Sequence, residues 1–323
     1  MGQKAPGKAF REGITLPELF KMFPDDDTAR RWIEWERWEG RPFCPHCGSE
    51  HVKAREHRSM PWRCQENGCR KPFSVRYGTA LQGSHLGYQT WVIAIYVLTT
   101  SLKGVSSMKL HRDLGITQKS AWYLAHRIRK TFEADRPDDP PMGGPVEVDE
   151  SYFGGKEGNK HASKKLNAGR GMVGKQIVVG VRDRATNEVR AAQVPDAKGA
   201  TLAGYVERNA DEDAMVYTDE AAAYARLPHR ESVRHGVGEY VRRQAHINGM
   251  ESHWATMKRA YMGVYHKWSP KHLQRYVGEF AGRHNIRCED TIAQMGRVVR
   301  GLENRRMRYE DLVKPNGLPS GAR

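Results

Sequence analysis

The sequence contains no apolar run of the roughly 20 residues that a helix needs to cross a bilayer. Its first ten residues, MGQKAPGKAF, have no apolar stretch of the secretory kind, so we expect no signal peptide and a cytoplasmic protein. No membrane partner is expected. At 323 residues, the chain is long enough for two or three domains with sizeable cores.

Acidic residues are scarce relative to basic ones. The chain has 38 Asp and Glu against 53 Lys and Arg, which gives a net charge of +15. A positive field of this kind raises the local concentration of a polyanion, so the composition favours nucleic acid as the partner. The alternative is a basic enzyme whose charge serves only solubility.

Cysteine is also sparse, which argues against a disulfide framework. Four of the five cysteines lie between Cys44 and Cys69, and Cys288 stands apart. The pairs CPHC and CQENGC, with sixteen residues between them, suit four thiolates around one tetrahedral ion, although the second pair is wider than the common CxxC. The alternative is four unrelated buried thiols. We predict a zinc ribbon with a closed, structural Zn²⁺ site formed by Cys44, Cys47, Cys64 and Cys69.

Helices are expected on both sides of the ribbon. Residues 15–38 carry apolar residues at helical spacing, and residues 88–102 form an apolar stretch suited to a core helix. Residues 105–131 follow the pattern of a helix-turn-helix, in which Gly115 ends the first helix and Thr117 caps the second. In one interpretation the second helix contacts DNA, and in the other it belongs to an ordinary helical hairpin with a solvated face. The DNA-binding candidates on its basic side are Lys119, Arg127 and Lys130.

A stretch rich in proline and glycine, DRPDDPPMGGP, marks the main boundary in the chain. It predicts a linker over residues 135–145. The full expected division is an N-terminal helical segment (1–40), a zinc ribbon (41–80), a helical region (81–134), the linker, a catalytic domain (146–290), and a C-terminal helix and tail (291–323).

The segment after the linker alternates strands and helices and places acidic residues among them. Residues 146–153 alternate apolar and acidic side chains, which predicts a strand carrying Asp149. Two more strands, a helix and a short strand ending at Asp219 follow. A later helix carries Glu251 and, seven residues on, Lys258. This order is that of an α/β, ribonuclease-H-like fold, in which the first and fourth strands are neighbours and the late helix crosses to them.

The three acidic residues suit metal-dependent chemistry on a phosphodiester. Hard divalent cations such as Mg²⁺ or Mn²⁺ take oxygen ligands, and Asp149, Asp219 and Glu251 supply carboxylates around one cleft. Two such ions about 4 Å apart activate a water or a 3′-hydroxyl for in-line displacement. Acidic residues at strand ends are also common turn formers, so no single one of them carries the prediction.

The blocks VEVDESYFGG, YTDE and HINGMESHWATMKRAYMGVYHKWSPKHLQRYVGEFAGRHNIR resemble the catalytic domain of IS1595-type (ISXO2-like) insertion-sequence transposases. The resemblance extends from Cys44 to about Arg287, zinc ribbon included. It implies a DDE-type acidic triad, magnesium, and the inverted-repeat ends of the enzyme's own element as substrate. It names Asp149 and Asp219 as metal ligands and leaves the third ligand open between Glu251 and Asn248, of which the carboxylate binds a hard cation more strongly.

Further residues are expected to act on DNA. Lys258, Arg259 and Lys271 are predicted to hold phosphates, whereas Trp254 and Trp268 are interpreted as packing residues. The expected partners are double-stranded DNA, as inverted-repeat ends and as target, and a second copy of the chain on that DNA, which would place the protein at the bacterial nucleoid. The alternatives are a non-transposing nuclease on the same fold and a zinc-ribbon DNA-binding regulator without chemistry.

Overall fold

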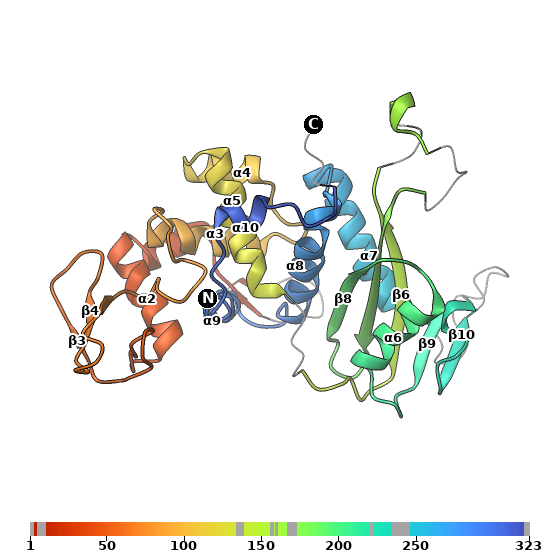
Figure 1. The fold of residues 1–323 in the computed structure, drawn as a ribbon, viewed down its shortest axis with the longest axis horizontal. Coiled ribbons are helices and arrows are strands. Elements are labelled where there is room, and N and C mark those ends of the chain that lie inside the picture. The colour runs from red at the N-terminus through yellow and green to blue at the C-terminus, as the bar shows by residue number, and fades with distance from the viewer. Residues whose placement is uncertain are drawn as a thin grey trace. The chain divides into compact units, whose positions relative to one another are not determined.

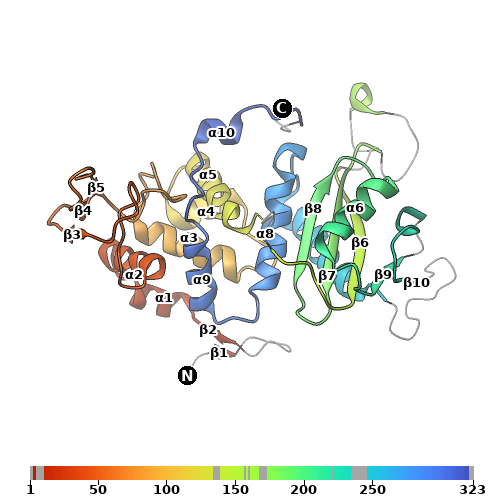
Figure 2. The same ribbon diagram turned by 60° about the horizontal axis from the view of Figure 1, so that its bottom comes forward.

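The structure is a computed structural model, and the residues it describes are 3–4, 11–133, 139–155, 158, 161–166, 173–219, 222–233 and 246–319 (Figures 1 and 2). The chain forms two compact units. The first consists of residues 1–132 and 286–314, and the second of residues 133–285 and 315–323. Within the described ranges, no helix has both the length and the apolar character needed to cross a membrane.

The first unit consists mainly of helices, and capping residues in the sequence mark where several of them begin. Thr15 and Glu18 form a capping box at the start of α1, and the Asp25 side chain caps α2 by accepting from the Thr28 amide. Gly115 ends α4 in the left-handed region, and Thr117 caps α5. The helices of this unit are α1 (Leu16–Met22), α2 (Asp26–Trp38), α3 (Tyr88–Thr100), α4 (Ser107–Leu114), α5 (Gln118–Arg129), α9 (Thr291–Arg300) and α10 (Tyr309–Val313).

A three-stranded antiparallel sheet lies beside α2 and carries the cysteine pairs. Its strands are β3 (Val52–Ala54), β4 (Trp62–Cys64) and β5 (Pro72–Phe73), in that order. Trp38, at the end of α2, packs edge-on against Trp62 and Phe73 with ring centroids 5.9 and 6.1 Å apart. Trp38 of α2 therefore completes the aromatic core of the small sheet.

The C-terminal part of the chain returns to complete the first unit. Met295, Val298 and Val299 of α9 lie in the same buried cluster as the residues of α2 and α3. The Arg37 guanidinium lies 3.1 Å from the Glu303 carboxylate and also donates to two backbone carbonyls at the start of the turn after β5. The second unit is thus inserted between two parts of the first.

The second unit is a mixed α/β domain built on a five-stranded sheet (Figure 1). The strand order is β10-β9-β6-β7-β8, in which β6, β7 and β8 are antiparallel neighbours and β9 runs parallel to both β6 and β10. The strands are β6 (Val146–Phe153), β7 (Gln176–Asp183), β8 (Val189–Val194), β9 (Val216–Asp219) and β10 (Arg230–Val233).

The two faces of this sheet bury different helices, as the alternation of a strand requires. Val146 and Val148 face a core shared with α6 (Gly199–Asn209). Phe153 faces a second core shared with α7 (Asn248–Ala260) and α8 (Leu273–Asn285). Asp149 has the same parity as Phe153 along the strand, so it lies on the face that α7 covers.

Candidate functional site

The four predicted zinc ligands come together in the first unit. The ligand atoms of Cys44, Cys47, Cys64 and Cys69 all lie within 4.8 Å of one another. The sulfurs of Cys44 and Cys69 are 3.7 Å apart, and those of Cys47 and Cys64 are 3.6 Å apart. Sulfurs about 2.3 Å from one tetrahedral Zn²⁺ are separated by about 3.8 Å, so the cluster has the dimensions of a four-thiolate metal site.

Local backbone geometry explains how the first cysteine pair forms a turn. The Gly48 amide donates to the Cys44 carbonyl over 2.8 Å, and Gly48 has φ +78°, a region that favours glycine. Burial raises the pKa of the Cys64 thiol to about 12, so this group keeps its proton unless a cation displaces it. His46, inside the same turn, packs its ring against Tyr77 with centroids 4.3 Å apart instead of joining the sulfurs.

In the second unit, α7 packs on the sheet beside the strand that carries Asp149. Asp149 on β6 is the register partner of Gly180 on β7. A Cβ added at Gly180 would lie 2.4 Å from Met250 Cε and 2.8 Å from Trp254 Cζ2, so α7 rests directly on the strand at this point. Glu251 follows Met250 on the helix and is exposed.

The electrostatics of Asp149 show that the carboxylates share one neighbourhood. Burial, followed by the charges of Glu150, Asp219 and Glu251, raises the pKa of Asp149 to about 8. Asp219 ends β9, which runs parallel to β6 at the centre of the sheet. In the described part of the chain, these carboxylates are not drawn together as tightly as the cysteine sulfurs.

Sequence reasoning missed a fourth carboxylate, that of Glu150. The Tyr224 hydroxyl donates to Glu150 Oε2 over 2.7 Å, and burial is the main cause of the raised pKa of both groups. The charge of Asp219 also raises the pKa of Glu150. Strand alternation predicts that Asp149 and Glu150 point to opposite faces, and nothing in the sequence indicates that the charge of Asp219 affects both of them.

Three further predicted residues lie along α7. Asn248 is its first residue, Glu251 follows one turn later, and Lys258 lies near its end; all three are exposed. The charge of Glu251 raises the pKa of Asp149, whereas the amide of Asn248 is neutral and has no charge to act on it. The charge of Glu251 therefore acts on Asp149, and Asn248 lies about one turn earlier on the same helix.

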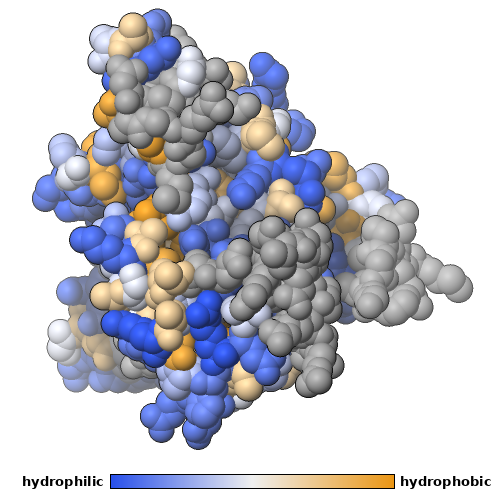
Figure 3. Space-filling view, turned by 90° about the vertical axis from the view of Figure 1, so that its right-hand side faces the viewer, coloured by the Kyte–Doolittle hydropathy of each residue, from blue (hydrophilic) through white to orange (hydrophobic). Residues whose placement is uncertain are grey.

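The other residues of this region divide into exposed basic groups and buried aromatic ones. Arg259 is exposed and Lys271 is half-buried. Trp254 and Trp268 are 2% and 5% exposed, which agrees with their interpretation as packing residues. On the coloured part of the face in Figure 3, hydrophilic residues predominate and apolar residues are scattered between them.

The predicted DNA-binding helix α5 is more deeply buried than its sequence suggests. Lys119 is exposed near its start and Lys130 is half-buried after its end. Arg127 is 4% exposed, and its guanidinium donates to the Gln82 carbonyl over 2.7 Å. Since Arg127 is enclosed within its own unit, we withdraw it from the predicted DNA-binding residues. The spacing of basic residues along α5 suggested a single solvent-exposed face. The last turns of the helix face the core instead.

Most of this chain is similar to a protein from a known transposable element. Residues 141–285 match the protein family described as the ISXO2-like transposase domain. The chain is also similar to an uncharacterized protein in the transposable element ISH50 of Halobacterium salinarum, with 27% identity over 282 residues that cover 82% of this chain and 93% of the relative. The predicted resemblance to this transposase family is therefore confirmed.

Proposed function

We propose, from the premise that residues 141–285 match the ISXO2-like transposase domain, that this chain is a DNA transposase that cuts and joins the ends of an insertion sequence. The observation that carries the proposal is the carboxyl group of Asp149. It lies on the strand that α7 covers, and burial, followed by the charges of three neighbouring carboxylates, raises its pKa. Neighbouring carboxylates repel one another when no cation is bound. Divalent cations prefer oxygen ligands and would relieve this repulsion.

The residues have distinct proposed roles. Asp149 and Asp219 hold the catalytic cations, Mg²⁺ or Mn²⁺, with Glu251 as third ligand and Asn248 as the alternative. When bound, two such cations supply activation of a water or 3′-hydroxyl and stabilisation of the leaving oxygen. Lys258, Arg259 and Lys271 neutralise and orient the DNA phosphates.

A ribonuclease-H-like fold is proposed for the second unit. Its support is the strand order, with three antiparallel strands followed by two parallel ones on the other side of β6. In this arrangement Asp149 sits on the central strand and Asp219 at the end of its parallel neighbour. The late helix α7 then carries the third ligand to them, as the proposed chemistry requires.

The first unit is proposed to bind DNA. Cys44, Cys47, Cys64 and Cys69 hold a structural Zn²⁺ whose closed shell takes no part in the reaction. The pair α4 and α5 serves as a helix-turn-helix, with Lys119 at the exposed start of the second helix, where such helices contact DNA. Joining of paired ends calls for at least two copies of the chain on DNA, by analogy with other transposases.

The test is strand cleavage and joining on a DNA that carries the element's own ends, in Mg²⁺. Wild type is compared with Asp149→Ala, Asp219→Ala, Glu251→Ala and Asn248→Ala. We expect metal-dependent cleavage that is lost in both Asp variants and in Glu251→Ala, and retained in Asn248→Ala. Arg226→Ala is a control, since Arg226 is half-exposed and pairs with Glu207 of α6, the helix on the sheet face opposite α7.

Each outcome has a defined meaning. Full activity of the Asp149 and Asp219 variants contradicts the metal-ligand assignment. Loss in Asn248→Ala with retention in Glu251→Ala makes Asn248 the third ligand. Tight binding of the ends by a wild type that cuts nothing contradicts the enzymatic proposal and favours a DNA-binding regulator.

A further inference from the structure

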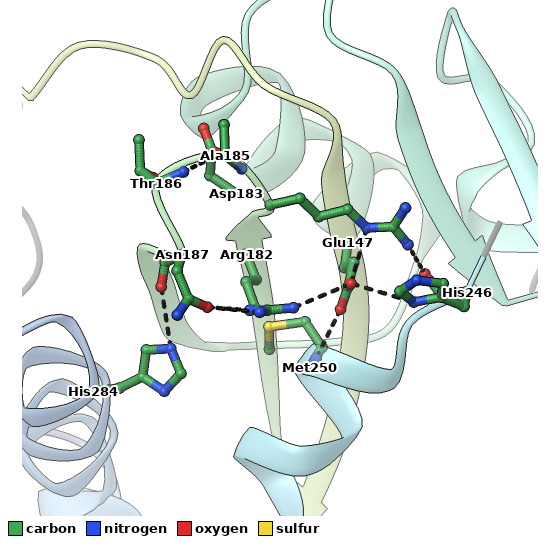
Figure 4. A network of polar contacts seen from close by, with 10 residues as sticks. Glu147, Arg182, Asp183, Ala185, Thr186, Asn187, His246, Met250 and His284 are labelled. Carbon is green, nitrogen blue, oxygen red and sulfur yellow. Dashed lines mark hydrogen bonds and ion pairs between the residues drawn. The ribbon is translucent and has the colours of Figure 1, made fainter. Parts of the chain in front are cut away.

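The helix that carries the third ligand has no cap of its own. The residue before α7 is Ile247, which has no side chain able to accept from the first-turn amides. A carboxylate from another element does so instead, because Glu147 Oε2 on β6 accepts from the Met250 amide over 3.0 Å (Figure 4). A negative charge at this position also interacts favourably with the helix dipole.

The same carboxylate is held by two arginines. Glu147 is fully buried, and its Oε1 accepts from Arg182 Nη1 over 3.1 Å and from Arg184 Nε over 2.9 Å. Arg182 is the register partner of Glu147 and is itself fixed by Asn187 Oδ1, at 2.8 and 2.6 Å from its Nε and Nη2. Arg184 donates to the His246 carbonyl, just before α7. The Glu147–Met250 and Arg184–His246 bonds join the sheet and the turn after β7 to the start of α7, and the Arg182 bonds hold Glu147 in place.

Close packing at Gly249 shows how tightly this helix start is set. A Cβ added there would lie 1.6 Å from Arg182 Nη1 and 2.6 Å from Glu147 Oε2. The backbone of the first turn therefore rests against the Glu147–Arg182 pair, with no room for a side chain. With the contact at Gly180 one turn further along, α7 is fixed on the sheet at two points.

We propose that Glu147 is a positioning residue that sets the distance between Asp149 and the turn of α7 bearing Asn248 and Glu251. Glu147 and Asp149 lie two residues apart on the same face of β6, so one strand carries both the anchor of the helix and the first metal ligand. The inference rests on the proposed function for its catalytic meaning. The anchoring of α7 is a separate claim that can be tested without DNA.

The test uses the full chain and compares Glu147→Gln with Glu279→Gln. Glu279 is an equally buried carboxylate in the same unit, 3.4 Å from Arg283 on α8, and it serves as the control for loss of a buried charge. Two quantities are measured without DNA: Mn²⁺ affinity by electron paramagnetic resonance, and hydrogen exchange of the Met250 amide. Half-saturating Mn²⁺ for cleavage is measured as a third.

For Glu147→Gln we expect faster exchange at Met250 and Mn²⁺ affinity lower by about 10-fold or more, as is typical when a residue supporting a metal ligand is changed. Cleavage should recover at high Mn²⁺. Glu279→Gln should change neither the exchange at Met250 nor the Mn²⁺ affinity. If Glu147→Gln only lowers the folded fraction, the amplitude of cleavage falls and the half-saturating Mn²⁺ concentration stays unchanged. That result overturns the proposal.

A milder variant covers the case in which Glu147→Gln does not fold. Asn187→Gly keeps the buried carboxylate and suits the φ of +65° at this position, but it releases Arg182. We expect a smaller change in the same direction, and unchanged Met250 exchange and Mn²⁺ affinity in this variant overturn the proposal. If wild type binds Mn²⁺ no better than Asp149→Asn, the proposed function fails, while the exchange at Met250 still decides whether Glu147 anchors α7.

Discussion

Gly180 lies opposite Asp149 in the register of β6 and β7, and its missing side chain lets α7 pack on the sheet beside that carboxyl. The helix that delivers Glu251 therefore depends on a residue with no chemistry of its own. This relationship connects the packing of the second unit to its acidic site, and it can be tested directly.

Gly180→Ala should loosen the site and lower stability. The new Cβ would meet Met250 Cε and Trp254 Cζ2 at 2.4 and 2.8 Å, and overpacking of this kind costs about 1–3 kcal/mol. We expect a lower free energy of unfolding in urea together with reduced cleavage. Gly204→Ala is the control: it lies within α6, where the nearest atom to a new Cβ is Arg208 Nη1 at 3.6 Å. Equal stability of wild type and Gly180→Ala would contradict the close packing.

Asp149→Asn should stabilise the protein in buffers without divalent cations, and more so as the pH rises. The pKa of Asp149 is about 8 when folded, above the unfolded value of about 3.9. The folded state then binds more protons, so wild type loses stability as the pH rises from about 4 to about 8, and the Asn variant does not share this loss. We expect a difference that grows to several kcal/mol at pH 8, since each pKa unit corresponds to about 1.4 kcal/mol, and little difference at pH 4.

The measurement for this prediction is urea unfolding of both proteins from pH 4 to pH 9. Added Mg²⁺ should reverse the order, because it binds the carboxylate of wild type and stabilises the state that it binds. A pH-independent difference between the two proteins would show that Asp149 is not buried among other carboxylates.

Removal of the proposed zinc should unfold the small sheet and leave the second unit folded. The sheet has three strands of two or three residues each and depends on Trp38 for its core. A strong chelator should release one Zn²⁺ per chain and increase proteolysis within residues 41–80, because metal binding and folding are coupled in such modules. Cys64→Ser should mimic the chelator. Cys288→Ser should not, since Cys288 is exposed and lies outside the cluster.

Lys119 and Arg127 should respond differently to truncation, although both lie on α5. Lys119→Ala should weaken binding to the element's ends and reduce the salt dependence of the binding constant by about one counterion, with little effect on stability. Arg127→Ala should lower the free energy of unfolding by about 1–3 kcal/mol, because it leaves the partly buried Gln82 carbonyl without its donor. Fluorescence anisotropy at several salt concentrations and urea unfolding separate the two effects. The reverse pattern would restore Arg127 as a DNA contact.

Much of the local structure follows from the sequence because its signals are local. Helix caps such as Thr117 and the alternation of β6 are each set by a few neighbouring residues. The cysteine cluster was predictable for the same reason, as four like ligands at suitable spacing leave few arrangements. The order of elements in the second unit likewise indicated that Asp149 and Asp219 would meet.

The features that were missed depend on contacts distant in sequence. Burial of Arg127 is set by the Gln82 carbonyl, 45 residues away, and no periodicity within α5 reports it. Glu147 looks like one more acidic residue of an alternating strand until Met250, 103 residues later, donates its amide to it. The hydrogen bond of Glu150 likewise comes from a residue distant in sequence, Tyr224, 74 residues later.

The return of residues 286–314 to the first unit has a consequence for synthesis of the protein. Residues 1–132 are made before α9, yet their buried core includes residues of that helix. Most of the second unit is the contiguous segment 133–285, which is made before α9, and residues 315–323 join it later. A nonsense codon just before α9 would therefore remove part of the core of the first unit, although residues 1–132 are made before the second unit.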